Sequence, residues 1–251
     1  MKYLILAPGG LSFYTLLGYL MRREEQLKEV EEISGSSSGA MIGFLLLSGK
    51  SLQEIFDATI NIDISELAKV DLKTFINSFG FINHELIKQK LIEIWGGNPT
   101  FKELPKKFHV SAYCLNTLEV EYFSRDTHPD MHVVEALCAS ISIPVMFAAY
   151  TYKGKKYVDG ATTECVPAGP FLHKNYSEVF CVNTRHAGDM KCDKIETMVD
   201  YFKRIALTGY KHRRRYDDIP GVLFDLSMID TLDFKASLET RLKLFTIGYG
   251  V

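Results

Sequence analysis

The sequence predicts an α/β fold in which a mainly parallel central sheet lies between layers of helices. Strand-like and helix-like segments alternate along the chain, which favours parallel strands joined by crossover helices. The length of 251 residues suits one large α/β domain, and no repeat or linker rich in Pro, Gly or Ser divides it. We therefore expect a single three-layer domain over residues 1–251.

Strands are predicted where short apolar or alternating runs end at turn residues, and helices where apolar residues recur at helical spacing. Ser51 with Glu54 three residues later is a capping-box pattern. Residues 61–106 are also candidates for part of a lid.

The predicted strands are 2–7, 30–35, 107–116, 118–125, 153–160 and 177–185, and the strands 107–116 and 118–125 form a hairpin. The predicted helices are 13–29, 40–49, 51–60, most of 61–106, 129–142 and most of 192–251.

The composition excludes several classes of protein. Apolar residues make up 47% of the chain and charged residues 24%, a balance that neither disordered nor coiled-coil chains have. The net charge is −2 without a basic tail, so we expect no nucleic acid partner. No apolar run approaches the roughly 18 residues of a membrane span, and the run that opens the chain is too short for a signal peptide. Any membrane contact would therefore be peripheral.

Five cysteines are scattered along the chain without a Cys-x-x-Cys spacing: Cys114, Cys138, Cys165, Cys181 and Cys192. Several lie in apolar runs, which predicts buried, reduced thiols. A disulfide framework is not expected at this length, so a reducing compartment, the cytoplasm, is favoured. The cysteines and histidines show no ligand spacing, and we expect neither a metal nor a cofactor.

Residues 35–39 read Gly-Ser-Ser-Ser-Gly and fit the G-x-S-x-G pattern with Ser37 at its centre. A predicted strand precedes the motif and an apolar helix follows it, which is the setting of a nucleophile elbow. Gly35 and Gly39 would tolerate a strained backbone and close neighbours there. The alternative is a serine-rich turn that only caps the helix.

A second glycine turn, Pro8-Gly9-Gly10-Leu11, follows the first predicted strand. Backbone N–H groups of such a turn can stabilise the oxyanion that forms in acyl transfer. The alternative is an ordinary tight turn between a strand and a helix. A nucleotide-binding loop is excluded, because no G-x-G-x-x-G is present and Phe44 replaces the glycine required upstream of Gly49-Lys50-Ser51.

Asp159 ends the predicted strand 153–160 and is followed by glycine, which would let its side chain project into a site. A serine hydroxyl needs a base to become nucleophilic. An Asp of ordinary pKa, ~3.9, is weak for this role in water, yet it can accept a proton directly in a partly desolvated site. The alternative is a turn-forming Asp-Gly pair.

Together, the glycine turn, GSSSGA and VDGA resemble the patatin-like phospholipase family, and the likeness extends over almost the whole chain. The most specific stretch is ALCASISIPVMFAAYTYKGKKYVDGATTECVP. The resemblance implies a patatin-like fold and a Ser-Asp dyad without histidine, with Ser37 as nucleophile and Asp159 as base. It also implies an oxyanion hole from the amides of Gly9, Gly10 and Leu11. The implied activity is phospholipase A-type hydrolysis of phospholipid or neutral-lipid acyl esters through an acyl-serine intermediate.

The first turn departs from the family pattern Gly-Gly-Gly-x-Arg/Lys-Gly. Pro8 replaces the first glycine and supplies no N–H, Ser12 replaces the basic residue, and Phe13 replaces the last glycine. Two central glycines are kept, so an oxyanion hole is still expected. The missing cation puts turnover and a preference for anionic head groups in question.

Two rival interpretations are open. A conventional Ser-Asp-His hydrolase would draw its histidine from His173, His186 or His212, which follow Asp159 in the chain. A catalytically weak or inactive lipid- or protein-binding module would use the same fold without turnover. A basic, partly apolar stretch at 198–216 is a candidate for contact with anionic lipid, although a helix with a solvated basic face would also explain it.

Overall fold

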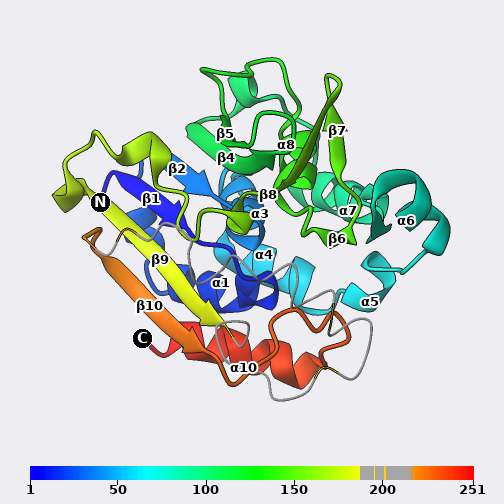
Figure 1. Cartoon of the computed structure of the whole chain (residues 1–251). Helices are drawn as coiled ribbons and strands as arrows, with labels where there is room; N and C mark the ends of the chain where they lie inside the picture. The colour runs from blue at the N-terminus through cyan, green and yellow to red at the C-terminus, as the bar shows by residue number, and fades with distance from the viewer. Residues whose placement is uncertain (187–194, 196–200, 202–215, 217) are drawn as a thin grey trace.

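The computed structural model of the chain describes residues 1–186, 195, 201, 216 and 218–251. Its centre is an eight-stranded sheet with strand order β10-β9-β1-β2-β4-β8-β7, and β5 also pairs with β4 (Figure 1). The strands of this sheet are β1 (Tyr3–Leu6), β2 (Glu32–Gly35), β4 (Lys107–Cys114), β5 (Glu119–Phe123), β7 (Tyr150–Tyr152), β8 (Lys155–Asp159), β9 (Val179–His186) and β10 (Gly221–Leu226). A separate parallel pair is formed by β3 (Gly80–Ile82) and β6 (Val145–Phe147).

The five strands from β10 to β4 run parallel, whereas β5, β8 and β7 join by antiparallel pairing. The α/β prediction with a mainly parallel sheet is therefore confirmed, and so is the β4–β5 hairpin. The carboxyl ends of parallel strands meet at one edge of a sheet, where ligand sites of open α/β folds lie.

Helices flank the sheet, and α1 packs closely along α10. The helices are α1 (Phe13–Met21), α2 (Glu24–Leu27), α3 (Ser38–Leu46), α4 (Leu52–Ile60), α5 (Ile64–Leu67), α6 (Leu72–Ser78), α7 (Glu85–Trp95), α8 (Val133–Ser140) and α10 (Leu238–Tyr249). Short 3₁₀ turns are η1 (Gly10–Ser12), η2 (Phe101–Glu103), η3 (Gly160–Thr162), η4 (Gly169–Phe171) and η5 (Tyr176–Glu178). A Cβ on Gly248 would lie 1.9 Å from the Thr15 carbonyl oxygen, so glycine is what lets α1 and α10 approach this closely.

Two predictions about local structure have clear outcomes. The capping box is confirmed, because the Ser51 hydroxyl accepts the Glu54 N–H and Glu54 accepts the Ser51 N–H. The prediction of a largely helical tail is wrong at 221–226, which forms strand β10 beside β9. The Pro220-Gly221 pair disfavours a helix, and buried side chains then alternate at Phe224 and Leu226, the period of a strand. Of the remaining tail, 238–249 is helical as predicted, and most of 192–217 lies outside the described residues.

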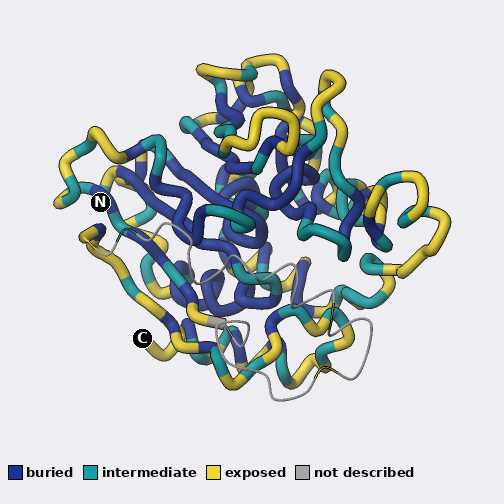
Figure 2. Tube along the Cα trace, in the orientation of Figure 1, coloured by how far each residue is buried: buried dark blue, intermediate teal, exposed yellow. Residues whose placement is uncertain are grey.

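Burial is uneven across the molecule (Figure 2). The central strands and α1, α3 and α8 are almost wholly buried, while residues 66–79 around α6 are largely exposed. Four cysteines, Cys114, Cys138, Cys165 and Cys181, are buried free thiols as predicted, and Cys192 lies outside the described residues. Within the described part of the chain, no helix has the length and apolar character to cross a membrane.

Candidate active site

Ser37 lies on a strained turn between β2 and α3. Its backbone angles are φ 52° and ψ −124°, a left-handed conformation that a residue with a Cβ rarely adopts. Such a backbone costs on the order of 1–3 kcal/mol and persists only where the surrounding structure enforces it. The side chain is only 5% exposed. The residue that the sequence singled out as nucleophile therefore has the geometry of an elbow between a strand and a helix.

The glycines on either side of Ser37 are required by close backbone contacts. A Cβ on Gly39 would lie 2.2 Å from the carbonyl oxygen of Leu6, which ends β1. A Cβ on Gly35 would lie 2.7 Å from the Cα of Ala40. Any larger residue would push α3 away from the sheet, so the glycine spacing of the motif follows from packing.

The backbones of Ser37 and Asp159 are both held by one short segment at the end of α8. The Ser37 N–H donates to the Ser140 hydroxyl oxygen at 2.8 Å. Two residues later, the Ser142 carbonyl accepts the Asp159 N–H at 2.9 Å. Ser140 and Ser142 are completely buried. The segment therefore fixes the two candidate catalytic residues relative to each other.

The strand register places the carboxyl end of β2 and Asp159 on the two sides of β4. Gly35, the last residue of β2, pairs with Val110 of β4. Two residues further along β4, Ala112 pairs with Asp159 of β8. The strands on either side of β4 are roughly 10 Å apart at the usual spacing, and Ser37 follows the end of β2 by two residues.

The Asp159 carboxylate is buried and oriented by its own turn. The residue is 3% exposed, and its Oδ1 accepts the Ala161 N–H at 2.8 Å across η3. The next position, Gly160, requires glycine because a Cβ there would lie 2.5 Å from the Ser111 hydroxyl oxygen. The Asp-Gly pair is therefore a turn, and it also places a carboxylate inside the protein.

His84 supports this arrangement and was missed by sequence reasoning. Its Nε2 lies 2.9 Å from the Ser142 hydroxyl oxygen, and that hydroxyl donates to the Cys138 carbonyl at 2.7 Å. Because a hydroxyl has one proton, Nε2 must carry the proton of the imidazole and donate it. Burial lowers the pKa of His84 to about 4, which keeps the ring neutral. The signal available in the sequence was His84 itself, within the segment FINHELIKQKL.

The glycine turn faces the elbow, with one correction to the predicted donors. The Leu11 N–H donates to the Thr231 carbonyl at 2.8 Å, so it is not available to an oxyanion, and the prediction for Leu11 is wrong. Gly10 has φ +57°, and a Cβ there would lie 2.3 Å from the same carbonyl oxygen. The Ser38 amide, at the first position of α3, has no acceptor within its helix. Ser38 is therefore a donor candidate that sequence reasoning had missed.

An apolar cavity of about 140 Å³ opens beside Ser37. It lies between the elbow, the glycine turn and the segment that contains α5. Its walls come from Gly10, Leu11, Phe13, Tyr14, Ser37, Ser38, Met41, Leu45, Thr59, Ile62, Ile64, Leu67, Ala68, Ile87, Lys90, Leu91, Ile94, Ile141, Ile143, Phe147 and Phe234. Most of these side chains are hydrocarbon, so the cavity suits a fatty-acyl chain better than a polar group.

One departure from the family pattern, Phe13, forms part of this wall, and Ser12 precedes it in the chain. Phe13 is buried and lines the cavity where the family usually has glycine. Ser12 is completely buried, and its hydroxyl has no hydrogen-bond partner in the part of the chain that the structure describes. A long cation in place of Ser12 would need space and a counter-ion, so the substitution fits an apolar surrounding.

Of the three histidines considered for a triad, His173 is the one whose side chain the structure describes. His173 is exposed, in contrast to Ser37 and Asp159. His186 is the last residue of β9, and His212 lies outside the described residues, as does the basic stretch 198–216 apart from Tyr201 and Tyr216.

Sequence comparison finds relatives over most of the chain. The family model for patatin-like phospholipases matches residues 4–172. The chain is 28% identical over 179 residues to the Probable lipid hydrolase 463L of Invertebrate iridescent virus 6, covering 66% of this chain and 61% of that protein. It is 26% identical over 168 residues to the Omega-hydroxyceramide transacylase of Mus musculus, covering 63% and 26%.

Two solved structures share the fold. VipD from Legionella pneumophila aligns with a TM-score of 0.65 and 17% identity, over 99% of this chain and 65% of that one. The type III effector ExoU of Pseudomonas aeruginosa aligns with a TM-score of 0.55 and 15% identity, over 99% and 51%. The chain thus spans less than two thirds of these relatives' own length. Because the family model covers more than half of the chain, the protein belongs to the patatin-like phospholipase family.

Proposed function

We propose that the protein is a lipid acyl hydrolase of phospholipase A type, with Ser37 as nucleophile and Asp159 as base. The observation that carries the proposal is the strained, buried Ser37 at the wall of an apolar cavity, tied to the same α8 segment as Asp159. Family membership supports lipid hydrolysis in general, as does the name of the viral relative.

In this mechanism Asp159 removes the Ser37 proton as the serine oxygen attacks the ester carbonyl of the lipid. The amides of Gly9, Gly10 and Ser38 hold the oxyanion of the tetrahedral intermediate. As that intermediate collapses, the proton passes from Asp159 to the leaving alcohol, which is a lysolipid when the substrate is a phospholipid. An acyl-serine is left.

The second half of the reaction repeats the first with water. Asp159 takes a proton from the water that attacks the acyl-serine carbonyl, and the oxyanion forms again among the same amides. Collapse returns the proton to the Ser37 oxygen and releases the fatty acid. The apolar cavity holds the acyl chain during both halves, which keeps the carbonyl near Ser37 and excludes bulk water from the carboxylate.

The setting of the reaction is part of the same proposal. Four buried free thiols among the described residues fit a reducing compartment, and we assign the protein to the cytoplasm with transient contact to membranes. Substrate would be drawn from a lipid surface without a membrane-spanning segment being required.

The direct test is incubation of the purified chain with phosphatidylcholine in detergent mixed micelles, followed by mass spectrometry of the lipids. We expect lysophospholipid and fatty acid in equal amounts, and neither product from Ser37→Ala. Lipid that binds to the folded chain without turnover would favour the inactive binding module.

A further inference from the structure

One face of helix α6 exposes large apolar side chains to solvent. Leu72, Ile76 and Phe79 follow one another at i, i+4 and i+7 and are 64%, 69% and 58% exposed. This spacing places them on one side of the helix, and we call these three residues the α6 face. Val70, just before the helix, is 73% exposed. Contiguous exposed apolar residues of this kind mark an interaction site more often than isolated ones do.

Phe79, in the α6 face, also has a strained backbone. It ends α6 in the left-handed conformation, with φ 64°, where helices ordinarily have Gly or Asn. An aromatic residue there adds backbone strain, and its ring is still largely exposed. Folding alone therefore does not explain Phe79, whereas a surface that covers the ring would.

The α6 face is linked along the chain, on both sides, to segments that line the Ser37 cavity. Ile64, Leu67 and Ala68 line that cavity, and the chain proceeds from them through Val70 into α6. On the other side α6 leads directly into β3, which pairs with β6, and Phe147 of β6 lines the cavity again. In Figures 1 and 2, α6 lies at the periphery of the molecule and is mostly exposed.

Lysines accompany this apolar surface. Lys73 is exposed on α6 itself, and the Lys156 ammonium lies 5.1 Å from the centre of the Phe79 ring. Asp71 is occupied as the N-cap of the helix, where it accepts the Lys73 and Thr74 N–H groups. Apolar side chains flanked by lysines are the pattern of a segment that lies in the interface of an anionic membrane.

We propose that the α6 face docks the protein onto an anionic phospholipid surface, so that lipid passes directly from the bilayer to the Ser37 cavity. The choice of a lipid surface as the occupant rests on the proposed function. Leu72, Ile76 and Phe79 enter the acyl boundary of the leaflet while Lys73 and Lys156 stay among the phosphates.

The test is flotation with vesicles of phosphatidylcholine and phosphatidylglycerol, carried out in a Ser37→Ala background so that no lipid is consumed. The double variant Leu72→Gln, Ile76→Gln, which we call the α6 pair, places good helix formers at both positions and removes most of the apolar face. The partition coefficient should fall about tenfold or more, since two large apolar side chains no longer leave water. The control pair Leu223→Gln and Leu242→Gln, exposed on β10 and α10, should stay within about twofold of the parent.

Equal flotation of the α6 pair and the parent would overturn the proposal, as would a parent that does not float. Light scattering could instead show that the parent is a dimer and the α6 pair is a monomer, with vesicle binding unchanged. In that case the α6 face binds a second copy of the chain, and the proposal fails. With Ser37 restored, the α6 pair should hydrolyse a soluble short-chain ester as fast as the unmodified chain. Loss of flotation with no ester hydrolysis by any version would refute the proposed activity and leave the docking surface in place.

Discussion

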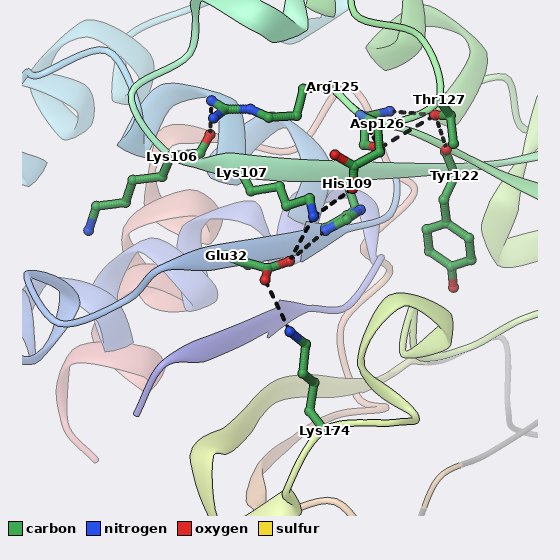
Figure 3. Close-up of polar contacts among 10 residues, drawn as sticks. Glu32, Lys106, Lys107, His109, Tyr122, Arg125, Asp126, Thr127 and Lys174 are labelled. Atoms are coloured by element: carbon green, nitrogen blue, oxygen red, sulfur yellow. Dashed lines mark hydrogen bonds and ion pairs between the residues drawn. The ribbon is translucent and has the colours of Figure 1, made fainter.

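The two ends of strand β2 differ sharply in their chemistry. At its amino end, the Glu32 carboxylate bonds His109 at 3.1 Å and Lys174 at 3.3 Å, and Lys107 lies 3.9 Å away (Figure 3). Past its carboxyl end, Ser37 has a strained backbone and faces hydrocarbon. At the first end each charge is compensated, which favours stability. At the second end, a strained backbone lies beside an apolar cavity, which favours chemical reactivity.

The ionisation of Glu32 reflects this compensation. Burial raises the pKa of its carboxyl, but hydrogen bonds from His109 and Lys174 and the charge of Lys107 outweigh that effect, so the pKa lies below 4.5. The cluster consequently contributes to stability at neutral pH. The proposed reaction requires no change in the protonation of any group in this cluster.

The largest effect is expected at the carboxyl end, from Asp159→Asn. The amide cannot accept the Ser37 proton, so turnover of a soluble ester should fall about 10³-fold while the fold is kept. Steady-state kinetics with circular dichroism would measure both. Asp225→Asn on the exposed strand β10 is the control, and equal losses in the two variants would contradict the assignment of a base.

Protonation of His84 should destabilise the protein next most strongly. Its pKa is lower in the folded chain, at about 4, than in the unfolded chain, near 6.5. The unfolded state therefore binds the proton first as the pH falls, and stability is lost between pH 6.5 and 4, on the order of 3 kcal/mol in total. His84→Gln keeps an N–H donor for Ser142 and should flatten this pH dependence in urea unfolding. An unchanged slope would contradict a buried neutral imidazole.

At the amino end, Glu32→Gln should reduce stability without affecting turnover. We expect a loss of about 2 kcal/mol at pH 7, because Lys174, Lys107 and His109 lose the partly buried carboxylate that pairs with them. Since the folded pKa is below the unfolded one, this contribution is present above pH 4.5 and is lost as the pH falls below it. Glu25→Gln, in the exposed pair with Lys28, is the matched control and should change little. A drop in ester turnover in Glu32→Gln would mean that the two ends of β2 are coupled.

The smallest effect is expected from Ser140→Ala. The Ser37 N–H would lose its acceptor, and a looser elbow should lower kcat about tenfold with little change in KM. Ser36→Ala removes a buried hydroxyl that has no partner among the described residues, so it should leave kcat almost unchanged. If both variants behave alike, Ser140 does not position the nucleophile.

Local signals in the sequence were enough for much of this structure. The elbow could be predicted because its glycines are required by close contacts among β1, β2 and α3, and the G-x-S-x-G pattern reflects that requirement. The capping box could be predicted because its hydrogen bonds span only three residues. The parallel sheet followed from the alternation of strands and helices. Each of these features leaves a pattern that can be recognised in the sequence itself.

The features that were missed depend on contacts between distant segments. The Thr231 carbonyl accepts the Leu11 N–H from more than two hundred residues away, and His84, just before α7, bonds Ser142, just after α8. Strand β10 pairs with β9, and nothing in the sequence of 221–226 identifies that partner. Long-range hydrogen bonds leave no periodicity in a sequence, so only the structure identifies them.

The central claim is that Ser37 is an activated nucleophile. A fluorophosphonate probe followed by intact mass spectrometry tests it directly on the wild-type chain, Ser37→Ala and Asp159→Asn. We predict one adduct on the wild type, none on Ser37→Ala and slow labelling of Asp159→Asn. No adduct on the folded wild type, or an adduct that persists in Ser37→Ala, would contradict it.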